Sequence, residues 1–320
     1  MTKHRLHASA LLPEIEISRG MNPQNGNNAE EFAASNVINA FNAELRWGSR
    51  NEDNKKIDLI LSFDHPWKST ERIILLVQIK SGNSYGRIEE ENLVLKKRAF
   101  AEVKRHLNSI CLFWVDNASS NVGWAYIHPN TSTRITRFGK NHFLNPSIRF
   151  EIARCITKNY SFKKSGGTGI HLKDITRSTT VSSLRKDVRT IYREMRRIES
   201  PLLGEIVFSS LGWKHMFRRS RRKKYKEQSL IVIPYLKNIL RQLPTAHWIN
   251  CLSKYTRKDF EFWQYEYVLR YENVKFNNEK CPVVIKIFEE IGYPFEWRSE
   301  PLLSQRVVRR VVFKSCNIKT

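Results

Sequence analysis

Two short apolar runs in the first half of the chain do most to limit its fold. Residues 56–63 and 72–80 are rich in isoleucine, leucine and valine and are almost continuously apolar, as is typical of central strands covered on both faces of a sheet. The turn residues Asp64, His65 and Pro66 lie between the two runs. We therefore expect two adjacent strands joined by a turn.

The surrounding sequence predicts helices on either side of these strands. Apolar residues recur every three or four positions over residues 29–41, and a second helix is predicted over residues 95–107. Further strands are predicted at residues 110–115 and 123–127. The order of helix, strands, helix and strands is that of a small α/β sheet domain.

The distribution of charge divides the chain into two domains. Residues 1–150 hold 20 Lys or Arg and 15 Asp or Glu, for a net charge of +5; the whole chain holds 55 and 31, so residues 151–320 hold 35 and 16, for +19. Small and polar residues from 161 to 180 predict a linker. We expect domains at residues 1–160 and 181–320, and the second has an α+β pattern.

In the second domain the sequence predicts two helices and three strands. An amphipathic helix is predicted over residues 184–198 and an apolar helix over residues 230–243. Strands are predicted at residues 262–271, 282–288 and 306–313.

The net charge of +24 and the pI near 10.0 indicate a polyanion as partner. No apolar run approaches the roughly 20 residues that cross a bilayer, and the N-terminal residues do not resemble a secretory signal. Five cysteines stand singly, without the spacing of a zinc site, and indicate reduced thiols in a cytoplasm. We expect a cytoplasmic protein that acts on nucleic acid and has no membrane partner.

Three polar residues at the edges of the two apolar runs have the character of a phosphodiester-cleaving site. Gln78 and Lys80 point to the same side of a strand, because strand residues alternate between faces, and Asp58 reaches the same place across the hairpin. A carboxylate and an amide oxygen suit Mg²⁺ or Mn²⁺, and a lysine can orient the attacking water and offset negative charge. The alternative is that polar residues merely end a strand.

A further carboxylate is expected from the preceding helix. Each residue of a helix advances by about 100° around the axis. Measured from Ala29, Glu30 falls between Val37 and Phe41 on the apolar face, whereas Glu31 falls on the solvent-facing side. A carboxylate that points inward is costly unless a cation or donor satisfies it. Glu30 is therefore the predicted metal ligand and Glu31 an ordinary surface residue.

These residues resemble a known superfamily. Gly26-x-x-Ala29-Glu30, then Asp58 and Gln78-x-Lys80, are similar to the PD-(D/E)XK restriction-endonuclease-like superfamily, especially its Gln-x-Lys branch in bacterial defence proteins, which is related to Mrr-type and Holliday-resolvase-like nucleases. The resemblance covers residues 20–150. It implies a restriction-endonuclease-like mixed sheet flanked by helices, with Glu30, Asp58 and Gln78 on one metal ion, Lys80 as the water-positioning residue, and duplex DNA as substrate.

Two positions depart from the pattern of that superfamily. The usual Glu or Asp of the strand motif is Gln78, which removes a charge from the site, and the proline that often precedes the aspartate is Ile57.

The second domain contains a strongly basic segment. Seven of the nine residues from 218 to 226 are Lys or Arg, and neutralising several phosphates releases counterions. The predicted nucleic-acid-binding residues are Arg218, Arg219, Arg221, Arg222, Lys223, Lys224 and Lys226, and Arg306, Arg309 and Arg310 are expected to extend the same surface. The alternatives are a solvated loop or a site for an acidic partner protein.

A weaker resemblance concerns the second domain. The stretch Glu205-Ile-Val-Phe-Ser-x-x-Gly-Trp-Lys-His215 and the later Ser315 are similar to barnase-EndoU-colicin-RelE-type toxin ribonucleases, with His215, Arg218 and Ser315 at the matching positions. The resemblance implies metal-free RNA cleavage with His215 as acid or base.

The sequence thus predicts a two-domain, Mg²⁺-dependent deoxyribonuclease of bacterial antiviral or mobile-element defence. A toxin-like ribonuclease and a non-catalytic nucleic-acid-binding subunit of a larger complex remain as alternatives. A defence-system partner protein and oligomer formation are left open.

Overall fold

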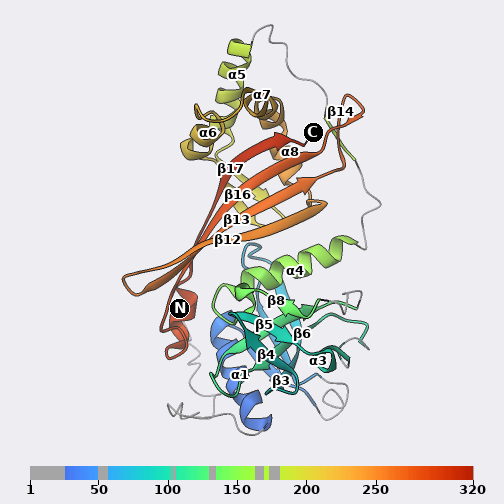
Figure 1. The fold of residues 1–320 in the computed structure, drawn as a ribbon, viewed down its shortest axis with the longest axis vertical. Coiled ribbons are helices and arrows are strands. Elements are labelled where there is room, and N and C mark those ends of the chain that lie inside the picture. Colours follow the sequence, from blue (N-terminus) through green and yellow to red (C-terminus); the bar gives the residue numbers. More distant parts are fainter. Residues whose placement is uncertain are drawn as a thin grey trace, which may run out of the picture.

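The α/β class predicted from the sequence is confirmed by a computed structural model, whose strands form four sheets (Figure 1). The structure describes residues 26–49, 57–101, 103, 106–129, 135–162, 169–172 and 181–319. Within these residues, no helix is long and apolar enough to cross a membrane.

The first half is built around a five-stranded sheet. Its order is β1 (Glu44–Trp47), β2 (Leu59–Asp64), β3 (Arg72–Ser81), β6 (Ile110–Val115) and β7 (Val122–Ile127). β3 and β6 are parallel, and the other neighbours are antiparallel. The predicted hairpin is confirmed, because β2 and β3 pair from Leu59 opposite Val77 to Asp64 opposite Arg72.

The two faces of this sheet are covered by different elements. Side chains of β3 alternate, so that Val77 and Ile79 join the core that contains helix α1 (Gly26–Phe41). Leu76 instead joins a second core, which holds β5 (Asn92–Leu95) and α3 (Lys97–Ala101). Two further strands, β4 (Gly86–Glu89) and β8 (Arg137–Phe138), pair with β5 on that side.

The predicted helix over residues 95–107 is wrong at both ends, since His106 and Leu107 are not helical and the helix ends at Ala101. Leu93 and Leu95 are buried while Val94 between them is only half-buried, which is the alternation of a strand, and pairing with β4 takes these residues into β5. The helix α3 begins only at Lys97. Residues 102, 104 and 105 lie outside the described residues.

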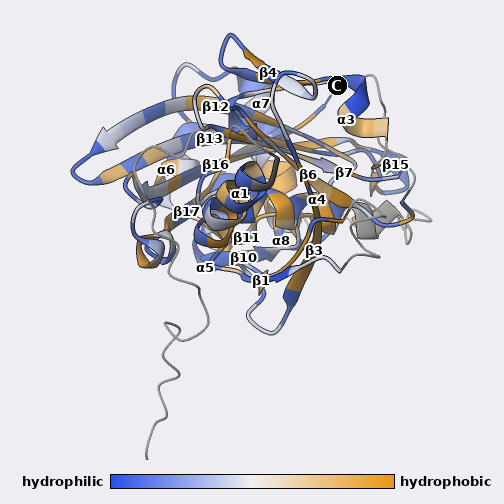
Figure 2. Ribbon diagram, turned by 90° about the horizontal axis from the view of Figure 1, so that it is seen from below, coloured by the Kyte–Doolittle hydropathy of each residue, from blue (hydrophilic) through white to orange (hydrophobic). Residues whose placement is uncertain are grey.

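The second half forms a six-stranded sheet with long central strands. Its order is β10 (Arg197–Ser200), β11 (Gly204–Val207), β17 (Val308–Ile318), β16 (Val283–Pro294), β13 (Phe260–Tyr271) and β12 (Ala246–Arg257). The hairpin of β12 and β13 projects from the body of the molecule (Figure 1), and its outer end is largely hydrophilic (Figure 2). The helices of this half are α5 (Val181–Glu194), α6 (Ser210–Met216), α7 (Lys223–Val232) and α8 (Leu236–Leu240).

Two predicted helices of the second half have different bounds in the structure. The amphipathic helix ends at Glu194 rather than residue 198, because Arg196 turns the chain with φ 31° and Ile198 enters β10. The apolar helix predicted over residues 230–243 begins earlier, at Lys223. It is interrupted where Pro234 lacks the N–H that a continuous helix needs.

Part of the predicted linker is structured. Ile170–Leu172 form β9, which pairs in parallel with β14 (Val274–Phe276), and β14 pairs with β15 (Glu279–Lys280). Most of the remaining linker residues, 163–168 and 173–180, lie outside the described residues.

Helix α4 (Ile148–Phe162) connects the two halves through a buried set of charges. Arg154 Nη2 lies 2.5 Å from Glu289 Oε1, and Arg309 Nε lies 2.7 Å from the same oxygen. Arg154 also pairs with Glu151, which accepts a hydrogen bond from Tyr267 at 3.1 Å. Burial opposes ionisation of Glu289, but the two guanidiniums hold the pKa of its carboxyl below the ordinary value. Residues of both halves share one hydrophobic core around this network.

Arg154→Met should lower the free energy of unfolding by about 3–5 kcal/mol, because it leaves the buried Glu289 carboxylate short of one partner. Lys68→Met is the control, since Lys68 pairs with Glu71 on the surface and should cost no more than about 1 kcal/mol. Urea denaturation measures both. An equal loss of unfolding free energy in the two variants would show that the buried network contributes no more than a surface ion pair.

His142 provides a pH-dependent contribution to stability. Its ring centroid lies 4.4 Å from that of Trp124, and Nδ1 lies 2.9 Å from the Trp124 carbonyl oxygen. Burial lowers the pKa of His142 from 6.5 to about 4. The folded state therefore prefers neutral His142, so its stabilising contribution is complete above pH 6.5 and is lost as the pH falls towards 4.

His142→Asn should reduce the dependence of the free energy of unfolding on pH between 6.5 and 4, by up to about 3 kcal/mol over that interval. Urea denaturation at several pH values measures the two curves. Parallel curves for the wild type and His142→Asn would show that His142 does not titrate with a lowered pKa.

Candidate functional site

The end of the β2–β3 hairpin brings three of the predicted site residues together. Asp58 lies just before β2, and its backbone N–H donates to the Val77 carbonyl at 2.9 Å. Its carboxylate Oδ2 accepts the backbone N–H of Ile79 at 2.5 Å. Because Ile79 lies between Gln78 and Lys80, this hydrogen bond fixes the Asp58 carboxylate beside the Gln-x-Lys motif.

Gln78 is the most unusual residue of the group. Its side chain is 0% exposed, and within the described residues neither Oε1 nor Nε2 has a hydrogen-bond partner. An unsatisfied buried amide costs about 1–3 kcal/mol, so a residue that only ended the strand would be better placed in solvent. A bound cation would supply the Gln78 Oε1 with a partner.

Lys80 lies two residues after Gln78 in β3, so its side chain is on the same side of the strand. Its side chain is half-buried, and Nζ lies 5.7 Å from the ring centroid of Tyr85. Arg98 of α3 approaches the same ring, with Cζ 5.2 Å from the centroid. No salt bridge of Lys80 occurs among the described residues. Two cations therefore flank one aromatic ring next to the Gln-x-Lys motif, where they would attract a phosphate.

Glu30 and Glu31 differ in burial as the helical periodicity predicts. Glu30 is half-buried and Glu31 is exposed, while Ala29 and Ala33 beside them are buried against the sheet. However, α1 packs on the face of β3 that carries Val77 and Ile79, and Gln78 and Lys80 point to the opposite face. A site that used all four residues would have to form around the end of β3, where the two faces meet.

The donor set fits Mg²⁺ in its chemistry. Among the described residues there is no group of three or more His, Cys, Asp or Glu side chains that could hold a metal. The candidate ligands are instead the two carboxylates of Glu30 and Asp58 and the amide oxygen of Gln78, all hard oxygen donors of the kind that Mg²⁺ prefers. The unpartnered Oε1 of Gln78 is the observation that supports this fit.

The basic segment from Arg218 to Lys226 runs from the loop after α6 into the first turn of α7, and most of it is exposed. Arg221 is the exception, since its guanidinium donates to the carbonyls of Met216 and Cys316, each at 3.1 Å. Arg221 therefore fastens the segment to β17. The exposed basic residues of the segment are Arg218, Arg219, Arg222, Lys223 and Lys224. Lys226, which is half-buried, lies 3.5 Å from the Arg219 carbonyl.

His215 and Ser315 lie on adjacent elements, α6 and β17, but no hydrogen bond joins them in the described structure. Burial and the nearby cations of Arg218 and Lys314 lower the pKa of His215. Lys314 in turn pairs with Glu266 at 2.6 Å. Ser315 is only 5% exposed, so a substrate phosphate would not reach its hydroxyl without rearrangement.

The expectation that Arg309 extends the basic surface is wrong. Its side chain is only 13% exposed, and the guanidinium donates to Glu289 and to the Leu203 carbonyl. The sequence does not reveal this network, because Arg154 and Glu289 are 135 residues apart and no spacing rule connects them.

Comparisons of this chain with protein-family models, with curated proteins and with solved structures gave no match. The function therefore has to be argued from the geometry of the candidate site.

Gln78→Leu should raise the free energy of unfolding by about 1–2 kcal/mol, because it removes a buried amide without partners. Gln264→Leu is the matched control, since the Gln264 amide donates to Glu290 at 2.6 Å and its loss should destabilise the protein. Urea denaturation of the two variants measures both effects. A destabilised Gln78→Leu protein would show that the carboxamide has a structural partner.

Proposed function

We propose that this protein is a Mg²⁺-dependent endodeoxyribonuclease whose site lies at the end of the β2–β3 hairpin. The observation that carries the proposal is the buried, unpartnered carboxamide of Gln78, placed next to Lys80 and to a carboxylate that is fixed on the backbone between them. The arrangement agrees with the resemblance to the PD-(D/E)XK superfamily. That resemblance also suggests a cytoplasmic role in bacterial defence.

The roles of the residues follow from their chemistry. Glu30, Asp58 and Gln78 would hold Mg²⁺, which when bound supplies a Lewis acid for the phosphodiester. Lys80 would orient the attacking water and offset the negative charge that develops on the phosphoryl oxygens. Arg98, which shares the Tyr85 ring with Lys80, would help to hold the DNA backbone.

Plasmid cleavage tests the proposal. Lys80→Ala should lower the rate of Mg²⁺-dependent cleavage by roughly a hundredfold or more, the usual loss for a group that stabilises developing charge. Lys96→Ala, an exposed lysine before α3, should retain the wild-type rate. Undiminished cleavage by Lys80→Ala would overturn the assignment.

The two neighbouring glutamates of α1 provide a matched pair for the same assay. Glu30→Gln should abolish cleavage at millimolar Mg²⁺, and Glu31→Gln should leave it unchanged, because of the two only Glu30 is directed into the protein.

Two other outcomes would select the alternative functions. If the protein cleaves RNA in the presence of EDTA and the His215→Ala variant does not, the toxin-like ribonuclease is selected instead. Binding without cleavage under any divalent ion would select a non-catalytic subunit.

A further inference from the structure

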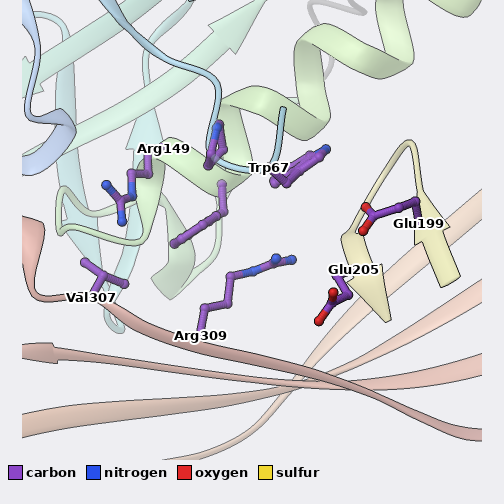
Figure 3. A pocket seen from close by; sticks show the side chains of 8 residues that line it. Trp67, Arg149, Glu199, Glu205, Val307 and Arg309 are labelled. Atoms are coloured by element: carbon purple, nitrogen blue, oxygen red, sulfur yellow. The ribbon is translucent and has the colours of Figure 1, made fainter. Parts of the chain in front are cut away.

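A cavity of about 400 Å³ lies where the two halves meet (Figure 3). It adjoins the turn of the β2–β3 hairpin, whereas Asp58, Gln78 and Lys80 lie at the other end of that hairpin. Its walls come from the β2–β3 turn, from α4, from β10 and β11, and from the start of β17; the lining residues are Pro66, Trp67, Arg149, Phe150, Glu199, Glu205, Val307 and Arg309. Arg149 and Val307 lie at one end, Glu199 and Glu205 lie at the other, and Trp67 and Arg309 lie between them (Figure 3).

One end of the cavity is lined by an arginine that no carboxylate neutralises. Arg149 is half-buried there, and its Cζ lies 5.0 Å from the ring centroid of Phe150. Arg149 also forms no ion pair in the part of the chain that the structure describes. Arg309 is different, because Glu289 and the Leu203 carbonyl hold its guanidinium in place. An anionic group bound near Arg149 would neutralise its guanidinium.

At the opposite end of the cavity, two carboxylates lie close to each other. Glu199 and Glu205 lie directly opposite each other in the β10–β11 pairing, and like charges in such a position destabilise a sheet. Arg197 forms an ion pair with Glu205 at 3.1 Å, and the two side chains are 69% and 42% exposed. Glu199 has no ion pair among the described residues. A ligand that donates hydrogen bonds would offset this repulsion.

We propose that this cavity binds a mononucleotide, with its phosphate at Arg149 and an amino-bearing base at Glu199 and Glu205. An arginine suits the planar, bidentate recognition of a phosphate. A carboxylate accepts from the exocyclic amino group of a base. The volume of the cavity lies within the range of small-ligand sites. This inference does not depend on the proposed nuclease activity.

Isothermal titration calorimetry of the full chain without Mg²⁺ tests the inference. AMP, CMP and GMP should bind and raise the melting temperature. UMP should bind at least about tenfold more weakly, because carbonyl oxygens flank its ring N–H and would face the two carboxylates. Equal binding of UMP, or inorganic phosphate binding as tightly as the nucleotides, would overturn base recognition. No heat with any nucleotide would overturn the site.

Single substitutions test the two ends of the cavity independently. Arg149→Gln should weaken every nucleotide at least about tenfold, whereas Arg241→Gln, an exposed arginine after α8, should change nothing. Glu199→Gln replaces an exposed side chain and leaves the fold intact, so it should reduce the preference for AMP, CMP and GMP over UMP. An unchanged preference in Glu199→Gln, or unchanged affinity in a folded Arg149→Gln protein, would contradict the proposal.

Discussion

The relative position of the two halves depends on one buried carboxylate. Glu289 lies in the middle of β16 and is fully buried, which is tolerable only because guanidiniums from two elements reach it. Arg154 comes from the last helix of the first half and Arg309 from the last strand of the second. The charge of Glu289 therefore ties α4 to the second sheet. The same docking brings the β2–β3 turn and its Trp67 against β10 and β11, and so forms the cavity between the halves.

Local patterns in the sequence predict the elements whose burial follows a simple period. The β2–β3 hairpin and the different burial of Glu30 and Glu31 could both be derived from alternation and helical spacing. The same reasoning fails at Ile198, where the apolar spacing of a helix continues past a chain reversal at Arg196. It also fails for β12, whose residues from 250 to 257 are exposed and which exists because β13 pairs with it along its whole length.

The candidate nuclease site was predictable in part. Hairpin register alone places Asp58 near Gln78 and Lys80. Sequence could not show that the Asp58 carboxylate is bonded to the backbone of Ile79, that Gln78 is entirely buried, or that α1 covers the other face of β3. These three facts depend on packing between elements that are distant in sequence. They restrict any common metal site to the end of the strand.

The position of β12 has a consequence for how copies of the protein meet. β12 is the last strand of its sheet, and such an edge exposes backbone groups that can pair with another chain. Two features of this strand oppose that pairing: the register shift between Cys251 and Ser253, and the exposed cations of Lys254 and Arg257 towards its end. An irregular edge with cations at its outer end is a poor template for pairing with the edge of another sheet.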